Sequence, residues 1–190
     1  MLEDELRTTR DLIYYRIANL KYKNNGKPAN EFSKLNELQK KSIERIFYDL
    51  KNSGGNSLES GNGDPLHLES EKKCIYCNDT QNVSSTHIIP KSLKILSNCG
   101  SCNMVQGVHN LVWICKNCRE EKGLKGLYEF YKTKYPESQD FCDFIPPLLE
   151  QKYLQTMFCC HRCAGTLDKV DINEDGNVDV LDIDFIVHHL

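Results

Sequence analysis

Four cysteine pairs of the form C-x-x-C constrain this chain more than any other feature of its sequence. They account for eight of the ten cysteines in 190 residues. The pairs are Cys74/Cys77, Cys99/Cys102, Cys115/Cys118 and Cys160/Cys163. In a reducing compartment this spacing is typical of metal binding rather than of disulfide bonds. The acidic start of the chain lacks the apolar core of a secretion signal. We therefore expect a cytoplasmic protein whose cysteines bind metal.

Composition and charge indicate the general class of protein. Hydrophobic residues make up 39% of the chain and charged residues 27%, as in soluble globular proteins. No apolar run approaches the ~18 residues of a membrane span, so we expect no membrane partner. Residues 87–134 carry eight Lys and Arg against three acids, whereas residues 166–190 carry one Lys against seven acids. The basic part suits a polyanion and the acidic part a cation, although ordinary solvated faces explain the charges equally well.

Apolar periodicity and turn residues divide the chain into four parts. Helical spacing is found over residues 3–22, about 30–50 and 148–164, and a short apolar helix is expected from Leu181. A polar stretch rich in Gly and Ser separates the first two helices from the cysteine-rich region. The predicted parts are a helical hairpin (1–52), a flexible linker (53–72), a cysteine-rich core (73–134) and a helical tail (135–190).

Two of the cysteine pairs predict a structural zinc site. Cys74/Cys77 and Cys115/Cys118 are separated by 37 residues, and each pair can direct two thiolates at one ion. Such a site supplies folding energy that a short, loop-rich segment lacks. A second zinc could be held by the other two pairs, Cys99, Cys102, Cys160 and Cys163, with Cys159 or His161 as spare ligands. Free, buried thiols are an equally good interpretation of that second set.

The two cysteine pairs of the predicted structural zinc site are called the first and second zinc knuckles below. The motifs in and between them follow the same order as in a known protein family. After the first knuckle comes His87-Ile88-Ile89-Pro90, then Asn110-Leu111-Val112, the second knuckle and Lys122-Gly123. Over residues 74–134 this order closely resembles the His-Asn-His (HNH, ββα-metal) endonucleases. The resemblance implies an α+β fold, with a zinc-stapled ββα nuclease core between the helical hairpin and the C-terminal helices. It also implies a metal-dependent hydrolase that cuts phosphodiester bonds in DNA, most readily double-stranded DNA.

The chemistry of phosphodiester hydrolysis agrees with the resemblance. The reaction needs a base for the attacking water and a cation for the charge on the phosphate. His87 is the candidate base, and by resemblance Asn110 orients the loop that carries it. Magnesium or another divalent cation is the implied catalytic metal. The candidates for contact with nucleic-acid phosphates are Lys91, Lys116, Arg119, Lys122 and Lys125, for which solvated surface cations are the alternative.

Two positions depart from the family pattern. Thr86 and Arg119 stand where the family usually has ligands for the catalytic metal. The Arg119 side chain has no acceptor atom and cannot bind a metal, but it can bind a phosphate directly. Replacement ligands could come from Glu120, Glu121 or His109. The sequence therefore predicts the fold more firmly than the activity.

An acidic segment near the end of the chain matches a calcium loop. Residues 171–182 place oxygen-bearing side chains at the ligand positions of the twelve-residue EF-hand loop, with Gly176 at its sharp turn. The predicted calcium ligands are Asp171, Asn173, Asp175, Asn177 (through its backbone carbonyl), Asp179 and Asp182. Asp182 replaces the usual final Glu, which resembles dockerin-type loops. The alternative is an acidic, solvated loop.

These observations favour a DNA endonuclease with structural zinc, and they leave two alternatives open. The first is a zinc-containing module that binds nucleic acid without cutting it, with Arg119 marking a lost metal site. The second is an interaction protein that docks a partner through its calcium loop. The sequence does not decide between DNA and RNA, nor does it indicate an oligomeric state.

Overall fold

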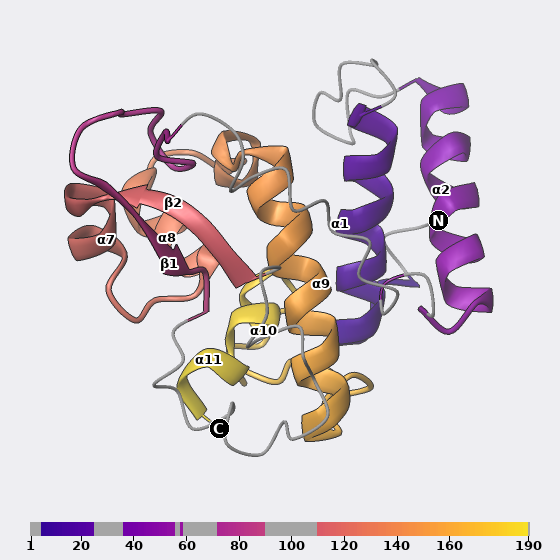
Figure 1. Ribbon diagram of the computed structural model, residues 1–190. Helices are drawn as coiled ribbons and strands as arrows, with labels where there is room; N and C mark the ends of the chain where they lie inside the picture. Colours follow the sequence, from indigo (N-terminus) through magenta and orange to yellow (C-terminus); the bar gives the residue numbers. More distant parts are fainter. Residues whose placement is uncertain (1–4, 25–35, 56–57, 59–71, 90–109, 190) are drawn as a thin grey trace.

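The computed structural model describes residues 5–24, 36–55, 58, 72–89 and 110–189, in which a small two-stranded sheet lies at one side of a group of helices (Figure 1). The elements are α1 (Thr9–Asn24), α2 (Glu37–Asn52), β1 (Val83–His87), β2 (Leu111–Cys115), α7 (Lys116–Lys122), α8 (Leu127–Lys134), the 3-10 turn η4 (Phe141–Phe144), α9 (Pro147–Ala164), α10 (Leu181–Asp184) and α11 (Ile186–His189). This mixture of helices with a two-stranded sheet is compatible with the predicted α+β class. Among the described residues, no helix has the length and apolar character needed to cross a membrane.

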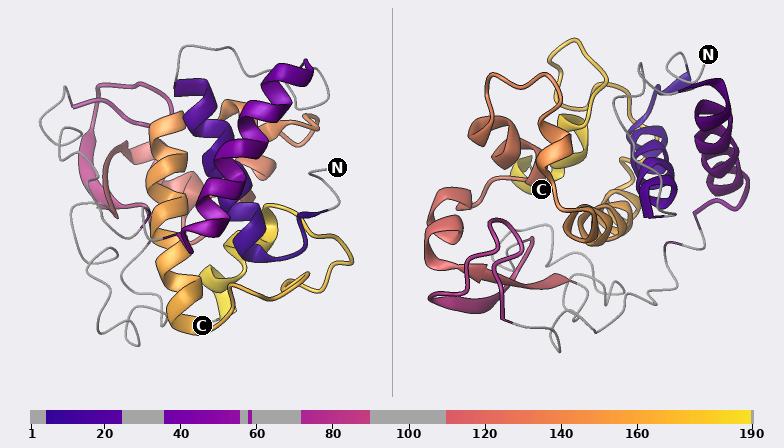
Figure 2. Two further views of the ribbon diagram at one scale, coloured as in Figure 1. Left: turned by 90° about the vertical axis from the view of Figure 1, so that its right-hand side faces the viewer. Right: turned by 90° about the horizontal axis from the view of Figure 1, so that it is seen from above.

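The first two helices lie side by side, as Figure 2 shows. α2 begins with a capping box, in which the Asn36 side chain accepts from the Gln39 N–H and the Gln39 side chain accepts from the Asn36 N–H. It buries Ile43, Phe47 and Leu50. α1 and α2 pack against each other, and residues 25–35, which connect them in the predicted hairpin, lie outside the described part.

Helix α9 connects this hairpin to the rest of the molecule. It coincides with the helix predicted over 148–164, beginning at Pro147 and ending at Gly165, whose φ of 69° suits a left-handed C-cap. α1 packs along α9 (Figures 1 and 2), and the Tyr14 and Phe158 rings lie 5.7 Å apart. The hairpin thus shares its apolar core with the C-terminal half. The predicted linker, 53–72, lies largely outside the described residues.

The sheet and the helix that follows it form a β–β–α unit. β1 and β2 are antiparallel, with Val83 opposite Cys115 at one end and His87 opposite Leu111 at the other. α7 starts directly after β2, and Cys115 serves as its N-cap by accepting from the Cys118 N–H. Over residues 83–122 the order of elements is therefore strand, strand, helix. The four cysteines thus lie at one end of the β1–β2 sheet, and His87 lies at the other.

A contact between distant segments caps α8. The N-cap of this helix is Gly126, which has no side chain to offer. Asp184, on α10, accepts instead from the Glu129 N–H at 2.7 Å and from the Tyr153 hydroxyl at 2.6 Å. A Cβ added at Gly126 would meet the Asp184 carboxylate. The tail therefore supports the turn between α7 and α8.

Candidate functional site

The structure brings together the four cysteines predicted to form the zinc staple. The Sγ atoms of Cys74, Cys77, Cys115 and Cys118 all lie within 4.8 Å of one another. The knuckle before β1 is joined to β2 by a hydrogen bond from the Ile75 N–H to the Trp113 carbonyl, 3.0 Å long. Three of the four cysteines are buried, and Cys77 is exposed. These residues could hold a metal such as zinc.

The spacing and protonation of the thiols suit such an ion. Ligands at ~2.3 Å from a tetrahedral zinc lie roughly 3.8 Å apart, and the Sγ atoms of Cys77 and Cys115 are separated by 3.7 Å. Burial raises the pKa of the Cys77 and Cys118 thiols. Burial also acts to raise the pKa of Cys115, but hydrogen bonds, led by the Cys118 N–H, lower it overall. A bound cation would favour the thiolate form of all four cysteines, so that the thiols release their protons on binding.

At the other end of the β1–β2 sheet, Asn110 fixes the backbone of the residues that follow His87. Its side chain accepts from the Ile89 N–H and donates to the Ile89 carbonyl, both at 2.9 Å. Its backbone carbonyl accepts from the Ile88 N–H at 2.8 Å. Asn110 is fully buried. This geometry suits a positioning residue, and it rules out direct contact with a large substrate in this conformation.

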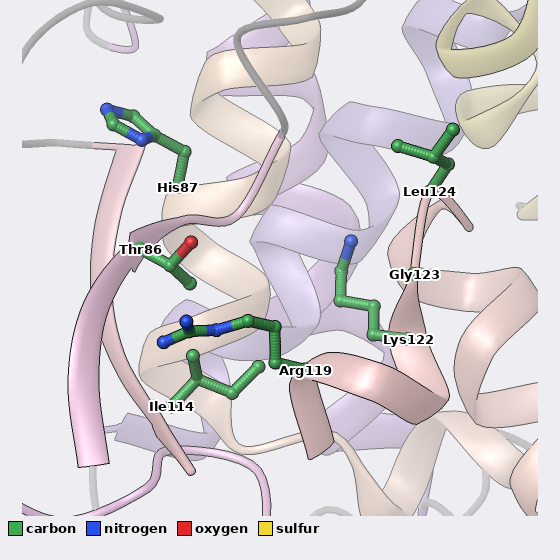
Figure 3. A pocket seen from close by; sticks show the side chains of 7 residues that line it. All are labelled: Thr86, His87, Ile114, Arg119, Lys122, Gly123 and Leu124. Atoms are coloured by element: carbon green, nitrogen blue, oxygen red, sulfur yellow. The ribbon is translucent and has the colours of Figure 1, made fainter. Parts of the chain in front are cut away.

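A pocket of about 380 Å³ lies between the end of β1 and the end of α7. Its lining residues, shown in Figure 3, are Thr86, His87, Ile114, Arg119, Lys122, Gly123 and Leu124. Successive side chains of a strand point to opposite faces, and Figure 3 shows the Thr86 hydroxyl on the side of α7. The His87 ring points away from Arg119 and Lys122. To engage the same ligand as these two cations, His87 needs a different rotamer.

Two cations enter this pocket from α7. The Arg119 guanidinium reaches across to β1 and donates to the Ser84 hydroxyl. Lys122 is only 5% exposed and donates from Nζ to the Lys125 carbonyl at 2.8 Å. Burial lowers the pKa of Lys122 to about 8, against the opposing effect of Asp184. The burial of Lys122 is not apparent from the sequence, where it reads as a surface lysine.

These lining residues do not fit the predicted magnesium ion. Magnesium prefers oxygen ligands, and among the described residues that line the pocket only Thr86 offers a side-chain oxygen. Glu120 and Glu121, considered as replacement ligands, lie outside the lining, and His109 lies outside the described residues. Arg119 and Lys122 also direct positive charge at this space. The charge favours an anion there.

Two of the other candidates for phosphate contact, Lys116 and Lys125, are not among the lining residues of the pocket. The Lys116 side chain is 72% exposed and pairs with Glu120 at 3.8 Å. Lys125 donates to the Glu121 carbonyl at 3.0 Å, and Lys91 lies outside the described residues. Among the four predicted cations that the structure describes, Arg119 and Lys122 line the pocket.

The predicted second zinc site falls partly outside the described residues, because Cys99 and Cys102 are not among them. Cys160 and Cys163 lie on α9, the first buried and the second exposed. His161, between them, is fully buried, and both its ring nitrogens are engaged, with Thr166 at 2.8 Å and the Ile183 carbonyl at 3.0 Å. Within the described residues, this histidine is therefore a structural group rather than a spare zinc ligand.

The predicted calcium loop is held by its own side chains. Asp171 accepts from the N–H groups of Asp175 and Gly176 at 3.1 and 3.0 Å. Asp182 accepts from those of Asn173 and Asp179 at 3.3 and 2.9 Å. Gly176 has a φ of 88°, as a sharp turn requires. Within the described residues, however, the carboxylates do not gather as closely as the four thiols do. The backbone has the expected turn at Gly176, while no three carboxylates of the loop lie within 4.8 Å of one another.

No protein-family model, curated protein or solved structure matches this chain.

Proposed function

We propose that the chain is an endonuclease that hydrolyses phosphodiester bonds in DNA, built on a zinc-stapled β–β–α unit. The observation that carries the proposal is the pocket that His87, Arg119 and Lys122 line from β1 and α7, in which the His87 ring must adopt a different rotamer to face the two cations. An imidazole and two cations suit a reaction that needs a base and positive charge around a phosphate. The cysteine cluster supports the proposal because it would hold the hairpin and α7 together from the opposite end.

In the proposed reaction His87 acts as general base. Its imidazole takes a proton from a water molecule, whose oxygen then attacks the phosphorus. The bond to the leaving oxygen breaks, and that oxygen takes up a proton. Asn110 fixes the backbone after His87 through its hydrogen bonds with Ile89. The cations on α7 oppose the negative charge that develops on the phosphate.

Replacing His87 by alanine is expected to reduce DNA cleavage by at least about a hundredfold, because general-base catalysis commonly contributes that much. Cleavage of plasmid DNA is measured with added magnesium or manganese, since the family resemblance predicts a divalent cation. His188→Ala is the control, because it removes a histidine that pairs with Glu129 outside the pocket. Equal cleavage by the His87 variant and the unaltered protein would exclude His87 as the base.

A second candidate function, binding of nucleic acid without cleavage, is favoured by the same pocket. Arg119 stands where the related pattern has a metal ligand, and the lining described above does not fit magnesium. DNA binding with no cleavage in any of several divalent ions would support this candidate. Detectable cleavage that depends on His87 would exclude it.

We also propose that residues 171–182 bind calcium. Calcium at about 100 times its Kd is expected to stabilise the fold by about 2.7 kcal/mol, because the ion binds the folded state. Thermal unfolding with and without calcium measures the effect. Asp171→Ala is expected to abolish it, whereas Glu174→Gln, which removes a charge at a non-ligand position of the loop, should retain it. An unchanged Tm in calcium for the unaltered protein contradicts the proposal.

A further inference from the structure

The α7 side of the pocket has an excess of positive charge that the neighbouring acids do not neutralise by direct contact. Arg119 and Lys122 are one turn apart on α7, and both line the pocket. No acidic side chain is among the described lining residues. The Arg119 guanidinium has five N–H donors and the Lys122 ammonium has three, so each can make further hydrogen bonds. Among the described residues, Arg119 donates to the Ser84 hydroxyl and Lys122 to the Lys125 carbonyl.

The acids on α7 are engaged elsewhere. Glu120 lies 3.8 Å from Lys116. Glu121 lies 3.5 Å from Lys134, on α8. Both carboxylates therefore face partners outside the pocket, and the helix presents one face with paired charges and one with two cations. An anion of suitable size is the natural partner of the second face.

We propose that this pocket binds a phosphate group directly through Arg119 and Lys122, with the Thr86 hydroxyl beside them and without a bridging divalent cation. The inference deepens the proposed function, on which its choice of a nucleic-acid phosphate rests. In this arrangement the protein contacts the phosphate directly, whereas in the HNH pattern a metal ion lies between the protein and the phosphate. Arg119 supplies the fixed charge, and a guanidinium can make two parallel hydrogen bonds to phosphate oxygens.

The state of Lys122 supports this assignment. Its pKa of about 8, lowered by burial, leaves the ammonium mostly charged at neutral pH. A bound phosphate would raise that pKa further, because an adjacent negative charge favours the protonated form. Asp184 and Glu129, which act on Lys122 from α10 and α8, already raise it. The Asp184 carboxylate is itself occupied by the Glu129 N–H and the Tyr153 hydroxyl.

The experiment measures binding of a labelled DNA duplex in buffer freed of divalent cations by a chelating resin, with the zinc content of the protein checked. Arg119→Gln is expected to weaken binding about tenfold or more, as loss of a charge-assisted contact does. The matched control is Lys116→Gln, which removes one charge from the exposed face of the same helix and is expected to weaken binding less than about threefold. Lys122→Met is the second variant, and circular dichroism verifies the fold of each.

Binding that requires added magnesium, or equal weakening in the Arg119 and Lys116 variants, overturns the proposal. A second arm follows inorganic phosphate by its ³¹P resonance with the same variants. If phosphate binds through Arg119 but DNA does not, the pocket takes a small phosphate compound, and the endonuclease proposal fails alone. If DNA binds through Arg119 and is never cut, the phosphate site stands and catalysis fails. These results separate the two proposals.

Discussion

Replacing Cys118 by serine is expected to unfold the β–β–α unit and to remove one equivalent of zinc. Structural zinc contributes an apparent ~10–16 kcal/mol in small zinc domains, which rivals the total stability of about 5–15 kcal/mol of a folded protein. An ion bound by the four thiols would join the segment before β1 to the start of α7. Loss of one ligand removes that connection and leaves three thiols without their common ion.

The only tryptophan of the chain makes this result easy to measure. Trp113 lies on β2, two residues before Cys115, and its carbonyl accepts from Ile75 in the first knuckle. Its fluorescence therefore reports on the hairpin, while elemental analysis counts the zinc. Cys142→Ser is the control, because Cys142 is a half-buried thiol outside the cluster. Retention of native fluorescence by the Cys118 variant in metal-free buffer would show that the fold does not depend on a metal ion bound by the four cysteines.

Replacing Glu150 by alanine is expected to lower the free energy of unfolding by about 3–5 kcal/mol, the typical cost of leaving one buried charge unpaired. The Arg16 guanidinium contacts Glu150 Oε1 at 2.6 Å from Nη2 and 2.7 Å from Nε. The Tyr128 hydroxyl donates to the same oxygen at 2.9 Å. Glu150 thus joins α1, α8 and α9 in one buried network, and its removal leaves two donors without their acceptor.

Thermal and denaturant unfolding measure the effect, with a fall in Tm of roughly 6–20 °C expected for a chain of this size. Asp168→Ala is the control: it breaks the pair with Arg10, whose side chains are 34% and 75% exposed, and should cost under about 1 kcal/mol. The double variant Arg16→Met with Glu150→Leu should recover most of the loss, since apolar groups can replace a buried ion pair. A loss no larger than that of the control would contradict a buried network.

The parts of the fold that follow from local chemistry are those that the sequence predicts. The C-x-x-C spacing turns two thiols toward one point within four residues, and the predicted gathering of Cys74 with Cys118 is found. Helix α9 has apolar periodicity, an initial proline and a final glycine, so its bounds were accessible as well. In each case neighbouring residues carry the information.

The remaining features depend on partners that the chain brings together only when folded. Arg16 and Glu150 are 134 residues apart, and neither residue has a local pattern that marks it as buried. Lys122 reads as one of many lysines, yet the turn into α8 buries it. The binding of zinc, calcium and magnesium stays a prediction, because it depends on how side chains gather rather than on their spacing along the chain.

The cap of α8 by Asp184 has a consequence for how such a sequence can change over evolutionary time. A Cβ at position 126 would lie 2.2 Å from the Asp184 carboxylate carbon, so any larger residue there would displace the carboxylate. A substitution of Gly126 becomes tolerable when a smaller residue replaces Asp184 and the new residue at position 126 has a side-chain oxygen that can cap the helix, as serine or aspartate has. In descendants and relatives of this chain, the two positions are expected to covary, although they lie 58 positions apart in the sequence.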